Sequence, residues 1–111
     1  MEHADLARIL HRALKGKTEV TLKFPIDSKD DLAVVYTPGV GTVSSDIGQN
    51  KDLVWEYTGR GNTVAVISDG SAVLGLGDIG PEAALPVMEG KCALFKRFAN
   101  IDAVLIVLNA R

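Results

Sequence analysis

The sequence is short of cysteine and of net charge, and each shortage excludes a class of protein. Its single cysteine, Cys92, can form neither an internal disulfide nor a cysteine-based metal site, so a reducing cytoplasm is expected. The formal net charge is only −2. The one basic cluster, Lys91, Lys96 and Arg97, is small, so neither nucleic acid nor an acidic membrane is expected as a partner.

Long hydrophobic runs and targeting signals are also missing. The longest apolar runs, such as residues 103–108, are far shorter than the roughly 20 residues that span a bilayer. The opening MEHADLARIL has no basic segment followed by an apolar one, so no signal peptide is expected. What is present is a chain of 111 residues, 47% hydrophobic and 23% charged, which is typical of one globular domain with a modest core.

The spacing of apolar residues predicts two main helices, over residues 3–14, ending near Gly16, and from about 86 to 98. Ser28 is a good N-cap for a further short helix. Two more short helical segments are expected at about 44–47 and 51–57.

Strands are predicted over residues 18–24, 63–68, 72–76 and 102–108, where apolar residues alternate or form short buried-type runs. The turn signal Asp69–Gly70 predicts that the second and third of these form a hairpin. Strands interleaved with helices indicate an α/β or α+β fold, with a small mixed sheet and flanking helices.

The stretch GLGDIG, residues 75–80, fits the dinucleotide pattern G-x-G-x-x-G. That fingerprint needs a strand, a glycine turn, a helix and a second strand with an acidic residue at its carboxyl end. Here Asp102 precedes the last strand, the helix is expected to begin late, and the strand before the glycines is expected to pair antiparallel. We therefore favour a glycine loop that lets the backbone pack closely.

Four stretches, taken in order, resemble one known family: YTPGV, YTGRGN, VISDGSAVLGLGDIGPEAALPVMEGK and LFKRFANIDAV. The chain resembles the amino-terminal, malate-binding domain of malic enzymes of the shorter bacterial type. The resemblance implies oxidation of malate by NAD or NADP and decarboxylation to pyruvate, assisted by a divalent metal, Mg or Mn. It also implies that residues 1–111 are a fragment lacking a carboxyl-terminal nucleotide-binding domain, with GLGDIG outside the NAD site.

The resemblance implies two catalytic residues, Lys91 as the base and Tyr36 as the acid. A lysine acts as a base only where burial or a neighbouring cation lowers its pKa, and the flanking Gly90 and Cys92 permit a poorly hydrated ammonium. Tyr36 lies where a helix must end before Pro38, so its ring can be aimed into a cleft. The ordinary alternatives are a solvated helix lysine and a packed tyrosine whose hydroxyl reaches water.

Arg60 and Leu74 are the substrate-binding candidates. The Arg60 guanidinium can bind a carboxylate through two hydrogen bonds, although a loop salt bridge is the explanation that we rank first. Larger family members carry an arginine where this chain has Ala72, so that anchor is missing. No metal ligand is assigned, because a turn explains Asp69 and a loop explains Asp78.

The resemblance further implies a homodimer, with Tyr36 of one chain near Lys91 of the other. Malate and pyruvate are the expected substrate and product. We expect these residues alone to bind neither nucleotide nor metal and to be inactive with malate. The alternative is a stand-alone, non-catalytic module that binds a dicarboxylate or a partner protein.

Overall fold

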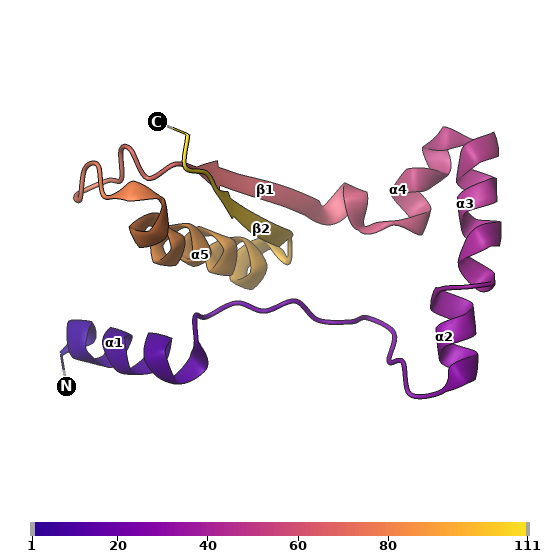
Figure 1. Ribbon diagram of the computed structural model, residues 1–111, viewed down its shortest axis with the longest axis horizontal. Helices are drawn as coiled ribbons and strands as arrows, with labels where there is room; N and C mark the ends of the chain where they lie inside the picture. Colours follow the sequence, from indigo (N-terminus) through magenta and orange to yellow (C-terminus); the bar gives the residue numbers. More distant parts are fainter. Residues whose placement is uncertain (1, 111) are drawn as a thin grey trace. The chain divides into compact units, whose positions relative to one another are not determined.

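The computed structural model describes residues 2–110, and these form two compact units (Figure 1). The first, called here the sheet unit, contains the residues up to Glu19 and those from Thr63 onward. The second, called the helical unit, is Val20–Asn62. The predicted domain spans 1–111, and its first and last residues lie outside the described part.

The sheet unit is a strand–helix–strand arrangement. Strand β1 (Thr63–Ser68) is followed by a loop, by helix α5 (Gly80–Ala99) and by strand β2 (Asp102–Val107). The strands pair in parallel, with the first residue of β1 opposite the first residue of β2. Helix α5 packs along both strands (Figure 1). The predicted fold class, α/β or α+β with helices flanking a small sheet, is confirmed, but the sheet is parallel where a mixed one was expected.

One stripe of α5 provides most of the core. Ala84, Met88 and Cys92 are 0–6% exposed, and their spacing of four residues places them on one face of the helix. Val73, from the loop before the helix, is the other buried hydrophobic residue in the described part of the chain, at 6% exposed. The sheet unit is therefore organised around the amino-terminal two thirds of α5.

Helix α5 begins earlier than the sequence predicted. It starts at Gly80 with Pro81 in its first turn, where a proline fits because the first amides have no helical partner. Pro86, near which the helix was expected to start, lies inside it. It removes one backbone hydrogen bond, and the buried stripe holds the helix together across it. Within residues 2–110, neither this helix nor any other has the length and apolar character needed to cross a membrane.

The predicted hairpin is wrong. Residues 72–76 form no strand beside β1, and their only ladder contact among the described residues is an isolated bridge between Val73 and Gly77. The amide of each of these two residues donates to the carbonyl of the other, at 2.7 Å in both cases. Gly75 and Gly77 have φ angles of 80° and 75°, so the glycines fold this segment back on itself.

Helix α1 (His3–Leu14) is confirmed with its predicted bounds. It ends through Lys15 in the left-handed region, at φ 57°, and Gly16 follows at φ 95°, which is a common way for a helix to stop. The strand predicted just beyond it, over 18–24, is wrong: this segment is irregular and exposed. Alternating apolar residues form a strand only beside a partner strand.

The helical unit is a series of short helices, each beginning soon after the last one ends. They are α2 (Lys29–Val35), α3 (Gly39–Gln49), η1 (Lys51–Leu53), α4 (Val54–Tyr57) and η2 (Gly59–Asn62). The Ser28 hydroxyl accepts a hydrogen bond of 3.1 Å from the amide of Asp31, so the predicted N-cap of α2 is confirmed. No residue of these five helices is buried.

Candidate active site

Tyr36 lies at the corner between α2 and α3, at the helix-to-loop junction that the sequence predicted. Its amide donates to the carbonyl of Leu32 at 2.8 Å, and its own carbonyl accepts from the amide of Val40 at 2.7 Å. Its backbone is therefore tied to both helices, while 65% of the residue remains exposed. A fixed backbone with an accessible ring is what a proton donor needs.

Arg60 stacks on an aromatic ring. Its guanidinium carbon lies 5.2 Å from the centroid of the Trp55 ring, which is within the range of a cation–π contact. The amide of Arg60 also donates to the hydroxyl of Thr58 at 3.2 Å. A cation–π contact does not use up the N–H groups of the guanidinium, so they remain suited to a carboxylate. This stacking contact is one that the sequence reasoning missed.

A second contact in the helical unit also escaped sequence analysis. The Tyr57 hydroxyl donates to a carboxylate oxygen of Asp46 at 3.3 Å, which joins α4 to α3. The charge of Asp46 raises the pKa of Tyr57, and partial burial and Glu56 act in the same direction. Tyr57 is therefore a protonated structural link in the neutral pH range.

Lys91 lies on α5 and is exposed. Its small and apolar sequence neighbours permit a poorly hydrated ammonium, but they do not cover the side chain in the described residues. Successive residues of a helix point about 100° apart, so the buried Cys92 faces the core while Lys91 faces away from it. Burial raises the pKa of the Cys92 thiol, and Glu89 raises it further. The apolar environment therefore surrounds the side chain of Cys92 and not that of Lys91.

The chain after α1 is held against α5 by the Glu89 carboxylate and by a backbone carbonyl. The backbone amides of Lys17 and Thr18 both donate to Glu89 Oε1, the second at 3.1 Å. The Lys17 ammonium donates to the carbonyl of Pro86 at 3.0 Å. Glu89, two residues before Lys91, therefore makes a structural contact. This contact could not be predicted from the sequence, because Glu89 lies far along the chain from Lys17 and Thr18.

The histidines of α1 have different surroundings. His3 is exposed, whereas His11 is half-buried. His11 Nδ1 lies 2.7 Å from the carbonyl of Ala7, and Nε2 lies 2.5 Å from the Lys17 ammonium. A carbonyl can only accept and an ammonium can only donate, so the His11 proton is on Nδ1. The ring therefore serves as a structural link.

Leu74 is presented by a closed loop between β1 and α5. The carbonyl of Gly70 accepts from the amides of Ile79 and Gly80, at 3.0 and 3.2 Å, and so joins the two ends of the loop. The amide of Ser71 donates to an Asp69 carboxylate oxygen at 2.9 Å, which confirms the predicted turn. Leu74 is fully exposed, at 100%. Its side chain is therefore free to contact a ligand or another chain.

The structure changes the argument about the glycine pattern. GLGDIG follows β1 and ends on the first residue of α5, inside a parallel strand–helix–strand unit. The expectation of a late helix start and that of an antiparallel strand before the glycines were therefore both wrong. The acidic residue remains misplaced, because Asp102 is the first residue of β2. In addition, Gly75 comes well after the end of β1 at Ser68. These two observations support the prediction that the motif is not a dinucleotide site.

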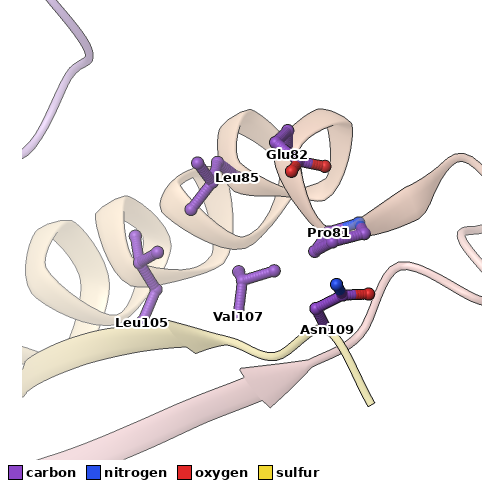
Figure 2. Close-up of a pocket in the computed structure, with 6 residues that line it drawn as sticks. All are labelled: Pro81, Glu82, Leu85, Leu105, Val107 and Asn109. Atoms are coloured by element: carbon purple, nitrogen blue, oxygen red, sulfur yellow. The ribbon is translucent and has the colours of Figure 1, made fainter. Parts of the chain in front are cut away.

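An open pocket of about 320 Å³ lies beside the first turns of α5 and the carboxyl end of β2 (Figure 2). It is mainly apolar, with one carboxylate and one amide. Its lining residues are Pro81, Glu82, Leu85, Leu105, Val107 and Asn109. None of the four predicted site residues lines it, so this hollow is separate from the predicted chemistry.

The described residues contain no set of side chains that could bind a metal ion. Among residues 2–110, no three His, Cys, Asp or Glu side chains are grouped so that they could hold a metal ion. The divalent metal that the resemblance implies therefore does not fit the described residues.

The four predicted site residues divide between the two units. Tyr36 and Arg60 belong to the helical unit, whereas Lys91 and Leu74 belong to the sheet unit. The meeting of the phenol and the lysine in one pocket stays a prediction.

Comparison with known proteins gives consistent matches along almost the whole chain. The family model described as malic enzyme, N-terminal domain, matches residues 15–111. A bifunctional malic/malolactic enzyme of Bacillus subtilis is 53% identical over 100 residues, which cover 90% of this chain and 24% of that protein. An NAD-dependent malic enzyme of Geobacillus stearothermophilus is 50% identical over 108 residues, covering 97% and 22%.

Solved structures agree with the sequence matches. The crystal structure of an NAD-dependent malic enzyme from Thermotoga maritima superposes with a TM-score of 0.87 at 52% identity, covering 94% of this chain and 29% of that one. A malic enzyme from Pyrococcus horikoshii gives a TM-score of 0.81 at 47% identity, covering 92% and 26%. The chain thus spans about a quarter of the length of these four relatives.

Proposed function

The chain belongs to the malic enzyme family, as its amino-terminal domain, and we propose that residues 1–111 provide the substrate-binding part of an enzyme that oxidises and decarboxylates malate. The observation that carries this proposal is the colinear match at about half identity over nine tenths of the chain. The matched region, residues 15–111, contains all four candidate residues. Some relatives are named NAD-dependent malic enzymes and others NADP-dependent malic enzymes, and we propose one of these two cofactors here.

We propose that Lys91 acts as the base. Its neutral amine takes the proton from the 2-hydroxyl of malate while a hydride leaves carbon 2 for the nicotinamide. A lysine does this only where burial or a neighbouring cation favours its neutral form, and Lys91 is exposed in the described chain. The side chain therefore needs a cover or a neighbouring cation, and α5 provides no cover.

Tyr36 acts as the acid in the proposed reaction. Loss of carbon dioxide from the oxidised intermediate leaves an enolate, and the Tyr36 hydroxyl gives its proton to carbon 3 to form pyruvate. The ring is accessible and its backbone is held from both sides, which supports this role. A nearby lysine favours the proton transfer because a cation stabilises the phenolate that remains.

Arg60 and Leu74 are proposed to contact the substrate. The in-plane N–H groups of Arg60 suit a carboxylate of malate, and the stacked Trp55 ring limits how far the guanidinium can move. Leu74 is fully exposed on its loop and would exclude water from one side of the ligand. Mg or Mn is proposed as a cofactor of the complete enzyme only, with ligands from outside the described residues.

We propose that the protein works as a homodimer in the cytoplasm. The apolar face of α1 carries Leu6, Ile9, Leu10 and Leu14, which are each 42–66% exposed, and no residue of α2, α3 or α4 is buried. Exposed apolar surface of this kind commonly marks a contact with another chain. A partner chain would also provide the missing cover for Lys91.

The test is an assay of the complete protein with malate, manganese and either nucleotide. Replacement of Lys91 by Ala should lower turnover by about 10²- to 10⁴-fold, which is the usual contribution of a proton-transfer group. The control is Lys51→Ala, an exposed lysine of η1, which should leave turnover unchanged. Full turnover by the Lys91 variant would refute the assignment, and binding of dicarboxylates without turnover in the unaltered protein would favour a non-catalytic module.

A further inference from the structure

The corner that holds Tyr36 has no room for a side chain at Gly39, the first residue of α3. A β-carbon added at this position would lie 2.6 Å from the carbonyl oxygen of Val34 and 2.7 Å from that of Ala33. Both distances are far below a normal carbon–oxygen contact, and both oxygens belong to the backbone, which cannot swing away. Gly39 is not among the residues with positive φ, so space, not dihedral freedom, requires the glycine.

The same corner fixes Tyr36. Its amide is bound to the last turn of α2 through Leu32, and its carbonyl is bound to the first turn of α3 through Val40, at 2.8 and 2.7 Å. The closeness of the two helices therefore sets the direction in which the Tyr36 side chain leaves the backbone. That closeness depends on the absence of a side chain at Gly39.

We propose that Gly39 is a positioning residue for Tyr36, acting by letting α3 begin in contact with the last carbonyls of α2. This inference rests on the proposed function, because it gives Gly39 a part in the proton transfer assigned to Tyr36. Any β-carbon at position 39 must separate the two helices, and the tyrosine hydroxyl moves with them. Proton transfer is sensitive to such a movement, since a shift of about 1 Å can cost about 10²-fold in rate.

The chain offers a matched control for this experiment. Gly41 lies in the same helix two residues later, and a β-carbon added there would meet nothing within 4 Å. Gly39→Ala and Gly41→Ala are therefore the same chemical change in the same helix, one with a clash and one without. In the complete protein, Gly39→Ala should lower kcat about 10- to 100-fold with a smaller change in KM, and Gly41→Ala should change neither.

A double-mutant cycle with Tyr36→Phe shows whether the effect passes through the phenol. If Gly39 acts by positioning the hydroxyl, Gly39→Ala should cause little further loss once the hydroxyl is gone. An equal loss in both backgrounds would overturn the positioning role. Normal kcat in Gly39→Ala, alongside a low kcat in Tyr36→Phe, would also overturn it while leaving the proposed function intact. Normal kcat in Tyr36→Phe would refute the acid role itself, and the inference with it.

A structural measurement distinguishes displacement from unfolding. The complete protein is labelled with ¹³C-tyrosine, and the ring signals of Tyr36 and Tyr57 are assigned from their loss in the two Tyr→Phe variants. Gly39→Ala should shift the Tyr36 signals and leave those of Tyr57, which reports on the α3–α4 contact with Asp46. Unchanged Tyr36 signals, or loss of both sets, would overturn the positioning role.

Discussion

The carboxylate of Glu89 accepts a hydrogen bond of 3.1 Å from the backbone amide of Thr18, a residue far away in the sequence. The amide of Lys17 donates to the same oxygen. Two adjacent backbone donors therefore depend on one side chain of α5. Because the carboxylate is charged and half-buried, these bonds are stronger than those between neutral groups.

Removal of this carboxylate should loosen the contact between α5 and the chain after α1, leaving the Lys17 ammonium bound to the carbonyl of Pro86. We expect Glu89→Ala to lower the free energy of unfolding by about 1–3 kcal/mol, the range for hydrogen bonds to a charged acceptor, and to speed hydrogen exchange at Lys17 and Thr18. Glu19→Ala, which removes an exposed carboxylate of the same segment, is the control. Unchanged exchange at both amides in the Glu89 variant would contradict the arrangement.

The glycines of the loop before α5 should differ sharply in their tolerance of alanine. A β-carbon at Gly70, where φ is 73°, would lie 1.9 Å from the carbonyl oxygen of Gly80. Gly75 and Gly77 also have positive φ but open space around them. We expect Gly70→Ala to cost about 3 kcal/mol or more and the other two about 1–2 kcal/mol each. Thermal or denaturant unfolding measures the difference, and equal losses at all three positions would be inconsistent with the close approach.

The link between Tyr57 and Asp46 should appear at high pH. The carboxylate raises the pKa of Tyr57, so the folded chain holds this proton more tightly than the unfolded chain does. The resulting stabilisation is fully present below the ordinary tyrosine pKa of about 10 and is lost as the pH rises through the folded value. Asp46→Asn should return the pKa of Tyr57 toward its ordinary value in an ultraviolet titration, and the exposed Asp52→Asn should not.

Cys92 should be unreactive while the sheet unit is folded. The residue is 3% exposed, and burial raises the pKa of its thiol, so little thiolate forms at neutral pH and little of it meets reagent. A thiol-specific reagent should label the native chain slowly and the urea-unfolded chain rapidly. Fast labelling of native protein at neutral pH would show that this helix face is open.

The 111-residue chain alone should not turn over malate. It contains no complete metal-ligand set in the described part, and the match in GLGDIG lacks an acidic residue at the required place. We expect no reduction of NAD or NADP when this chain is incubated with malate and manganese, measured by nucleotide absorbance. Calorimetry with each nucleotide should likewise show no binding, and heat of binding with NAD would revive the glycine motif as a nucleotide site.

Features set by a few consecutive residues were predictable from the sequence. Ser28 caps α2, Gly16 follows the end of α1, and Tyr36 lies where Pro38 requires the helix to stop. Each depends on backbone geometry within about one helical turn. The fold class could be predicted because each helical or strand-like segment is recognised from the spacing of its own apolar residues.

Features that depend on distant partners were not predictable. The alternation in 18–24 looked like a strand but had no neighbour, and β1 pairs with β2 rather than with the adjacent 72–76. The expected start of α5 near Pro86 was too late, because the packing that continues the helix across this proline is not local in sequence. Strand pairing is decided by tertiary contacts, which propensity cannot reveal.

The candidate site likewise has some features that could be predicted from the sequence and others that could not. Tyr36 and Lys91 were found through resemblance, and their roles remain predictions. The stacking of Arg60 on Trp55 and the closeness of Gly39 to the carbonyls of α2 required coordinates, because one depends on side-chain direction and the other on how two helices meet.

The parallel pairing of β1 with β2 has a consequence for the order of folding. The two strands meet only after the intervening loop and the whole of α5 have been made, and their contact closes a long loop before it gains any hydrogen bond. Helix formation is local and fast, so we expect α5 to form first and the two strands to pair late. During synthesis on the ribosome, β1 must therefore wait without its partner until β2 has emerged from the exit tunnel.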